Sequence, residues 1–447
     1  MKGWGVGVGS DTNRQIDAPG GTVYGLLRRV IDVRPVELRA LGWSWLYIIA
    51  LFISYYILRP IRDEMGVAGG VENLPWLFTG TLVGMSAVNP PFAALVAKLP
   101  RVKFIGLSYR FFAVNLLLFA ALLQMASGEQ NIWIGRLFFI WTSIFNLFVV
   151  SVFWALMVDV FDSEQGKRLF GFIAAGATIG GILGSSVTAA LAQRVPATYL
   201  LLTSAILLEV AVFCVGRLSR LSSALSTRPA GQGEESPIGG SIVSGLSHAL
   251  KSPYLINVSV FLLLFSITST FLYFQQAEIA RKYFADRGAR TAFFDSVDLW
   301  VNILTLGAQL FVTARTIKRI GVALTLALLP LLSIFGFGTL AWAPTIAALV
   351  AFQVIRRAGN FAFARPTREV LFTVVPREDK YKAKSFIDTV VYRLGDQVGA
   401  WSYAGLSGLG LAMSGVAIVA VPISMLWLVN SLWLGRKQKS LEAVAAG

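Results

Sequence analysis

Charge, cysteine and histidine are scarce in this chain. Only 14% of its 447 residues are charged, and it has one cysteine, Cys214, and one histidine, His248. Soluble domains average about 25% charged residues, whereas 55% of the residues here are hydrophobic, which indicates a membrane protein. A lone cysteine excludes an intrachain disulfide and a thiolate metal centre. The sequence also has no metal-ligand spacing and no catalytic constellation, so we expect neither metal nor cofactor and no enzyme activity.

Acidic residues are outnumbered as well. The chain has 39 lysines and arginines against 24 aspartates and glutamates, a formal charge of +15. Such an excess can indicate nucleic-acid binding. Here, however, the basic residues form short clusters between apolar runs, which is the distribution that membrane topology produces. We therefore predict a lipid bilayer as partner and no nucleic acid.

Long apolar runs are abundant. A helix that crosses the hydrocarbon core needs about 20 largely apolar residues, and about twelve segments qualify. The first six are 41–65, 74–98, 103–126, 131–160, 169–194 and 198–218. The second six are 253–280, 293–315, 321–343, 345–374, 384–410 and 412–435. The sequence thus predicts an all-α membrane protein of about twelve transmembrane helices in two pseudo-symmetric six-helix lobes.

The predicted organisation has five parts. Residues 1–40 form a cytoplasmic tail, 41–218 the N-terminal lobe and 253–435 the C-terminal lobe, and 436–447 form a second cytoplasmic tail. Between the lobes, 219–252 is rich in serine, glycine and proline and is a linker by composition.

The distribution of basic residues predicts the orientation. One side of the membrane receives a series of clusters, namely Lys98/Arg101/Lys103, Lys167/Arg168, Arg217/Arg220/Arg228/Lys251, Arg315/Lys318/Arg319, Arg377/Lys380/Lys382/Lys384 and Arg436/Lys437/Lys439. The opposite connections around 127–130, 343–345 and 410–412 have no lysine or arginine. The loop after the seventh segment, with Arg281, Arg287 and Arg290, is an exception. We expect both termini in the cytoplasm.

Two stretches of the chain echo each other. Residues 153–184 and 368–399 both consist of an apolar segment, a short charged loop and a second apolar segment with glycines. A shift of 215 residues maps Glu164 onto Asp379, Lys167 onto Lys382, Gly180 onto Gly395 and Gly184 onto Gly399. Repeated halves are typical of transporters, in which substrate binds between the repeats.

The first predicted helix carries charge inside an apolar run. Arg59 and Arg62 are three residues apart and share a helix face, and Asp63 can pair with either. An ionisable side chain in hydrocarbon is retained where it faces a partner or a wet cavity, so this group is a candidate anion site. The alternative is a pair of interfacial arginines with a local ion pair.

A second charged region covers the tenth and eleventh predicted helices. It contains Arg356, Arg357, Arg365, Arg368 and Glu369, followed by Asp388, Arg393 and Asp396. The arginine fork suits carboxylate and phosphate oxygens, so we predict a small anionic substrate. The alternative, for Arg365, Arg368 and Asp388, is a charge network that latches the two lobes together.

Acidic groups near the seventh and eighth helices are candidate proton sites, because burial favours the protonated carboxyl. They are Glu278, Asp295 and Asp298. Solvation near a loop is an equal alternative for them. Asn146 could orient a ligand or form a bond between helices.

Three passages resemble the ATP/ADP translocases of plastids and obligate intracellular bacteria, a family related to the major facilitator superfamily. They are YYILRPIRDEMGV, FWALMVDVFDSEQGKRLFGFIAAGATIGG and ARPTREVLFTVVPREDKYKAKSFIDTVVYRLGDQVG, and together they cover about a fifth of the chain. The family's motif of a basic residue before an aspartate is present as Arg62 and Asp63. The chain departs from the family at Asp396, where the family has lysine, and at Thr142, where it has glutamate.

The resemblance implies a major facilitator-like fold and alternating access, with nucleotide exchange as the family activity. We expect a monomeric secondary transporter of an organic anion in a bacterial inner membrane, with ATP:ADP antiport as first choice. The alternative is a proton-coupled exporter of another phosphorylated, lipidic or drug-like compound. The residues assigned to substrate binding are Arg59, Arg62, Arg356, Arg357, Arg393 and Asn146. Those assigned to coupling or gating are Asp63, Glu278, Arg365, Arg368, Glu369, Lys382, Asp388 and Asp396.

Overall fold

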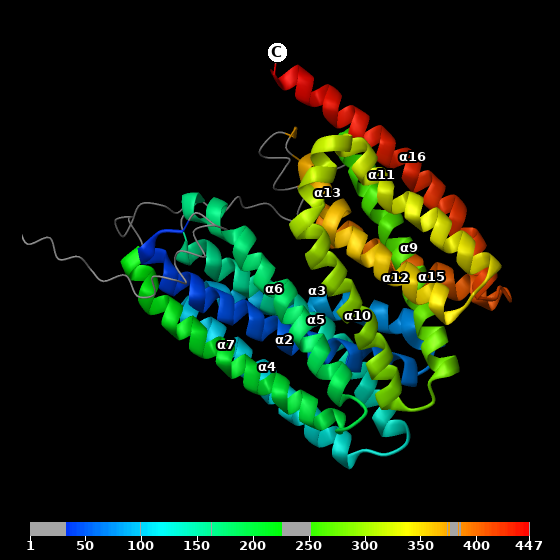
Figure 1. Ribbon diagram of the computed structural model, residues 1–447. Helices are drawn as coiled ribbons and strands as arrows, with labels where there is room; N and C mark the ends of the chain where they lie inside the picture. The colour runs from blue at the N-terminus through cyan, green and yellow to red at the C-terminus, as the bar shows by residue number, and fades with distance from the viewer. Residues whose placement is uncertain are drawn as a thin grey trace, which may run out of the picture.

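The computed structural model describes residues 33–98, 100–161, 163–225, 252–372, 374–375, 383 and 386–446. All regular secondary structure in these residues is helical (Figure 1). The first half of the chain forms α2 (Leu38–Ala68), α3 (Leu74–Lys98), α4 (Arg101–Met125), α5 (Glu129–Val160), α6 (Ser163–Leu191) and α7 (Ala197–Leu225). Short 3₁₀ turns, Pro35–Glu37 and Val71–Asn73, precede α2 and α3.

The second half forms six further helical segments. They are α9 (Pro253–Tyr283), α10 (Arg287–Phe311), α11 (Thr313–Trp342), α12 (Ile346–Gly359) continued by η3 (Asn360–Ala364) and α13 (Arg365–Leu371), η4 (Ile387–Val391) continued by α15 (Tyr392–Gly408), and α16 (Met413–Ala446). The predicted fold class is therefore confirmed. Nine helices in the described part are long and apolar enough to cross a membrane. Helix α10 is not among them, and its first half carries two arginines and two aspartates.

The predicted tail 1–40 and linker 219–252 fall largely outside the described residues, and so does Lys382. The division into lobes stays a prediction, and below we refer to α2–α7 as the first half and α9–α16 as the second half.

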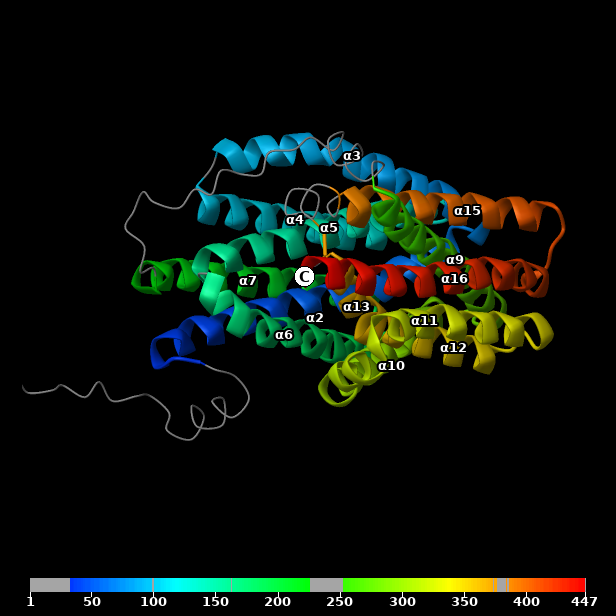
Figure 2. The same ribbon diagram turned by 90° about the horizontal axis from the view of Figure 1, so that it is seen from above.

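The two halves meet through a few helices. In Figure 1, α4 and α7 lie on one outer side and α11 and α16 on the other, with α6 and α10 between them. Helix α6 packs on α10, and α3 packs on α15. Figure 2 shows these two contacts on opposite sides of the molecule. The space between the two contacts is where a substrate site between repeats would lie.

Two glycines of the first repeat hold α6 against α2. A Cβ atom on Gly180 would lie 2.8 Å from the backbone oxygen of Ile49, and one on Gly184 would lie 2.8 Å from that of Ile53. Any larger residue at either position would force the two backbones apart. The spacing of four residues places both glycines on one face of α6.

The second repeat uses the same device. A Cβ atom on Gly395 would lie 3.2 Å from the backbone oxygen of Leu263, and one on Gly399 would lie 3.2 Å from that of Ile267. Each pair of glycines thus packs on the first helix of its own half, which is α2 in one case and α9 in the other. The sequence echo at a shift of 215 residues corresponds to equivalent packing in space.

The second half also contains two turns of π-helix, Asn360–Ala364 and Ile387–Val391. The positions 215 residues earlier, 145–149 and 172–176, are ordinary α-helix. The amide of Gln309 in α10 donates to the backbone oxygen of Phe361 inside the first π turn, at 3.4 Å. Isolated π turns often occur at functional sites, and both of these adjoin residues of the cavity described below.

We expect Gly180→Ala to lower the free energy of unfolding by about 1–3 kcal/mol, because the added methyl group overpacks the contact between α6 and α2. Thermal unfolding of the purified protein in detergent measures this loss. Gly216→Ala in α7 is the matched control, since a Cβ atom there meets nothing within 4 Å. An equal effect of the two substitutions would contradict the close packing at Gly180.

Candidate functional site

A cavity of about 290 Å³ lies between the halves. This volume is at the lower limit of the roughly 300–1,000 Å³ typical of small-molecule sites. Helices α2, α3 and α5 contribute to its wall from the first half, and α9, α12, η3 and α15 contribute from the second half. A site built by both halves changes its exposure when the halves move against each other.

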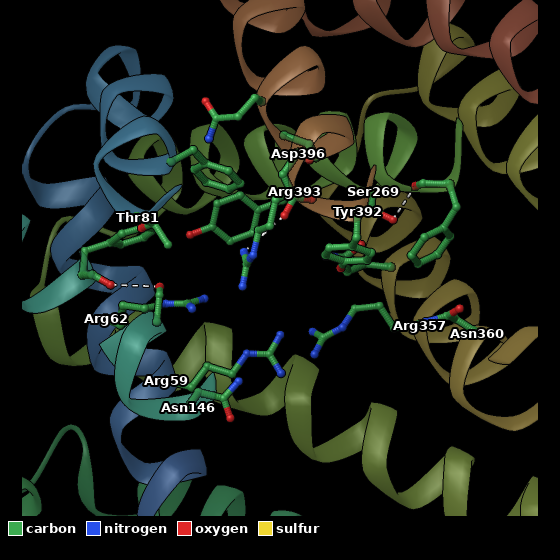
Figure 3. A pocket seen from close by; sticks show the side chains of 18 of the residues that line it. Arg59, Arg62, Thr81, Asn146, Ser269, Arg357, Asn360, Tyr392, Arg393 and Asp396 are labelled. Carbon is green, nitrogen blue, oxygen red and sulfur yellow. Dashed lines mark hydrogen bonds and ion pairs between the residues drawn. The ribbon is translucent and has the colours of Figure 1, made fainter. Parts of the chain in front are cut away.

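Five arginines line the cavity, namely Arg59, Arg62, Arg356, Arg357 and Arg393. Figure 3 shows the side chains of four of them, Arg59, Arg62, Arg357 and Arg393, directed from different walls toward the same central space. Asn146 of α5 also lines the cavity. The structure therefore brings together all six residues that the sequence assigned to substrate binding, although their role stays a prediction.

The carboxylate of Asp298 in α10 lies between two of these arginines. Its Oδ2 is 3.3 Å from Nε of Arg59 in α2, and its Oδ1 is 2.6 Å from Nη1 of Arg357 in α12. Only 3% of the Asp298 side chain is exposed. The alternative of a solvated carboxylate near a loop is wrong for Asp298, which is buried in an ion triad that joins the two halves.

Arg62 is neutralised by its neighbour in the chain. Its Nη2 is 2.6 Å from Oδ1 of Asp63, which also accepts a hydrogen bond from the Tyr273 hydroxyl of α9 at 3.0 Å. The Arg62 guanidinium lies 5.0 Å from the ring centre of Phe139, a cation–π distance. Asp63 thus connects the halves as well as pairing with Arg62.

Asp396 has a local partner. Its Oδ2 lies 3.3 Å from Nη1 of Arg393 on the same helix, and its Oδ1 accepts a hydrogen bond of 2.5 Å from the Ser266 hydroxyl. The aspartate that stands where the resembled family has lysine therefore offsets one arginine of the cavity. Thr142, the other departure, is buried and donates to the Phe138 backbone oxygen within its own helix.

Arg356 has no carboxylate within ion-pair distance among the described residues. Its guanidinium donates to the hydroxyls of Ser333, Ser269 and Thr268 at 3.0, 2.9 and 2.7 Å and to the Phe265 backbone oxygen at 3.3 Å. The residue is only 2% exposed. Four hydrogen bonds hold the guanidinium, but no carboxylate of the described residues neutralises its charge.

The cavity as a whole is therefore positive. Its five arginines are opposed by three paired carboxylates, namely Asp396, which lines the cavity, and Asp63 and Asp298, which do not line it but pair with arginines that do. Two positive charges remain in excess. In a site with low dielectric constant, such an excess favours an anion strongly.

A group of ion pairs joins the halves near the end of α2. Glu64, whose side chain is 3% exposed, lies 3.1 Å from Nε of Arg287 and 3.0 Å from Nη2 of Arg290, both in α10. Glu72 pairs with Arg281 at 2.8 Å. The Glu72 backbone N–H and the Arg281 guanidinium lower the pKa of the Glu72 carboxyl, so this pair is charged at neutral pH. We call this end of the bundle the closed end.

At the opposite end, two ion pairs between described residues each lie within one half. Arg168 pairs with Glu37 at 2.8 Å in the first half, and Arg368 pairs with Asp388 at 3.1 Å in the second half. This pair does not itself join the halves, and the alternative in which Arg365, Arg368 and Asp388 latch the two lobes together stays a prediction. The pair instead connects α13 to η4, which are neighbouring segments of the same half.

The other residues assigned to coupling lie outside the cavity. Glu278 accepts a hydrogen bond of 2.8 Å from the Tyr403 hydroxyl and lines a separate pocket together with Glu72 and Arg281. Arg365 and Glu369 are exposed on α13. A proton-coupling role for any of these residues stays a prediction.

Sequence reasoning missed part of the site. The sequence named Asp298 as a candidate proton site but not as the partner of Arg59 and Arg357. It also omitted the aromatic lining, which includes Tyr55, Phe78, Phe139, Tyr273 and Tyr392. The aromatic residues give no comparable signal in a chain with 31 phenylalanines.

Comparison with known proteins shows which proteins the chain is similar to. No family model matches the chain. ADP,ATP carrier protein 1 of Chlamydia trachomatis is 22% identical over 94% of this chain and 95% of that protein. ADP,ATP carrier protein 2 of Chlamydia pneumoniae is 20% identical over 90% of this chain and 89% of that protein. The chain is thus similar to ADP,ATP carrier proteins along nearly their whole length, at 20–22% identity.

Solved structures show the fold that the chain shares with known transporters. A bacterial homologue of the iron transporter ferroportin has a TM-score of 0.62 at 10% identity, covering 90% of this chain and 99% of that one. An auto-inhibited POT family peptide transporter has a TM-score of 0.60 at 12% identity, covering 89% and 96%. Together with the carrier relatives and the apolar helices, this fold makes the chain a multi-pass membrane transporter with a major facilitator-like fold.

The ion pairs of the closed end allow a matched test of stability. We expect Glu64→Gln to lower the free energy of unfolding by about 1–3 kcal/mol, because Arg290 would be left buried without a carboxylate. Glu72→Gln breaks an exposed pair and should cost about 0–1 kcal/mol. Thermal unfolding of both variants measures the difference. A larger loss of unfolding free energy for Glu72→Gln would refute the view that the Glu64 ion pairs are the stronger link between the halves.

Proposed function

We propose that this transporter exchanges nucleoside polyphosphates, such as ATP for ADP, across a bacterial inner membrane. The observation that carries the proposal is the cavity of five arginines with two positive charges in excess. The curated relatives, which are named ADP,ATP carrier proteins and match along nearly their whole length, support the same substrate class. We propose a monomer as the working unit.

The arginines suit the phosphate end of such a substrate. Guanidinium groups bind phosphate oxygens through paired hydrogen bonds, and an anion between Arg59, Arg62 and Arg357 would meet donors from both halves. Arg356 adds a positive charge that has no carboxylate partner among the described residues. A phosphate chain supplies the negative charge that this cavity lacks.

The aromatic residues suit the other end. Tyr55, Phe78, Tyr273 and Tyr392 line the same cavity as the arginines. A nucleobase presents two flat faces, and stacking on an aromatic ring contributes about 1–3 kcal/mol per base. A cavity that combines arginines with several rings matches a nucleotide better than it matches inorganic phosphate.

The distribution of charge also supports an orientation. Among the described residues, basic residues such as Arg101, Arg217, Arg319 and Arg436 belong to helix ends opposite the closed end, and basic clusters mark the cytoplasmic side. We propose that both termini are cytoplasmic and that the closed end faces away from the cytoplasm. The structure then represents the inward-facing state of alternating access.

The function is tested by exchange in proteoliposomes. We expect uptake of labelled ATP into vesicles loaded with ADP and little uptake into vesicles loaded with buffer alone. Empty liposomes and vesicles loaded with inorganic phosphate serve as controls. Absence of counter-exchange, together with absence of a thermal shift on addition of any nucleotide, would refute the proposed substrate.

A substitution in the cavity tests the site. We expect Arg62→Ala to raise the KM for ATP about tenfold or more, since a hydrogen bond to a charged group contributes about 1.5–3 kcal/mol and tenfold corresponds to about 1.4 kcal/mol. Arg136→Ala is the control, because Arg136 lies outside the cavity and donates to the Gly69 backbone oxygen. A large loss of thermal stability in Arg62→Ala with unchanged KM would show that Arg62 is structural.

A further inference from the structure

We propose that Asp298 is an internal counter-ion that the substrate replaces, and that it thereby prevents the empty transporter from changing its exposure. This inference rests on the proposed function, since it assumes that the substrate is an anion bound by the cavity arginines. It adds a reason why transport should be exchange rather than one-way release.

Asp298 pairs with one cavity arginine from each half, whereas Asp63 joins the halves through a single arginine and the Tyr273 hydroxyl. The two oxygens of Asp298 contact Arg59 of the first half and Arg357 of the second half, at 3.3 and 2.6 Å. Asp396, in contrast, pairs with Arg393 on its own helix. Movement of one half against the other therefore separates Asp298 from Arg59 but leaves the Asp396 pair together.

The ties at the closed end differ from Asp298 in position. Glu64 and Glu72 pair with arginines that do not line the cavity, so a substrate in the cavity does not reach them. Asp298 is the described carboxylate whose two arginine partners, from different halves, both line the cavity. An anionic substrate can therefore compete for this tie directly.

The energetic consequence depends on whether the cavity is filled. In the empty transporter, opening of the closed end would pull Arg59 away from a carboxylate that is 3% exposed and leave buried charges without partners. A phosphate group bound to Arg59 and Arg357 replaces the carboxylate during the same movement. The loaded transporter can then reorient, whereas the empty one remains in place.

Efflux from loaded proteoliposomes tests the inference. We expect wild-type vesicles to release labelled ADP rapidly into buffer with ATP and slowly into buffer without nucleotide. Asp298→Asn should raise release into nucleotide-free buffer about tenfold, because a neutral amide no longer holds Arg59. Asp396→Asn changes the charge of the same cavity by the same amount and should not raise this leak. An unchanged leak in Asp298→Asn, or an equal rise in both variants, would overturn the inference.

A second measurement is independent of the substrate. The chain has one cysteine, so Cys214→Ser gives a background without cysteine. In this background, Ala277→Cys places a reporter at a position that is 0% exposed, in an apolar cluster to which both halves contribute. In lipid nanodiscs without nucleotide, Asp298→Asn should increase maleimide labelling of this reporter, and Asp396→Asn should not.

The two measurements separate the possible failures. Increased labelling in Asp298→Asn without any nucleotide exchange by the wild type would refute the proposed substrate. It would still support Asp298 as the link that holds Arg59 and Arg357, and so the two halves, together. Normal exchange with unchanged leak and labelling in Asp298→Asn would refute the tie alone. If Asp298→Asn fails to fold, Arg59→Gln breaks the same contact from the other half and must increase labelling for the inference to stand.

Discussion

An arginine side chain keeps its proton under all conditions that a protein meets, so five arginines between apolar helices demand negative charge or hydroxyl groups nearby. The structure supplies both. Three carboxylates pair with four of the arginines, and serine and threonine hydroxyls accept hydrogen bonds from the fifth, Arg356. The positions of Asp63, Asp298 and Asp396 follow from this requirement, and the charge that remains determines what the cavity can accept.

The two halves meet this requirement unequally. Their frameworks are alike, since paired glycines bring α6 onto α2 and α15 onto α9 in the same way. Their charges are not alike. With the shift of 215 residues, Arg393 corresponds to Thr178 and Asp396 corresponds to Gly181, and neither of these residues of the first copy is charged. The two copies thus pack in the same way but differ in the charge that they bring to the cavity.

Much of this arrangement could be predicted from the sequence. The apolar runs predicted the helices, because about 20 apolar residues have few other stable arrangements in a bilayer. Arg59, Arg62, Arg356 and Arg357 stood out for the same reason, since charge inside an apolar run requires an explanation. What the pattern could not supply was partner choice. Asp298 lies near a loop in sequence, and only the packing of α10 between the halves buries it.

The π turns at Asn360–Ala364 and Ile387–Val391 affect how the two copies can be aligned. A π turn holds more residues than the α turn it replaces, so it acts as a small insertion that adds no loop. A single numerical offset between the copies therefore cannot describe equivalent positions on both sides of such a turn unless a neighbouring loop absorbs the difference.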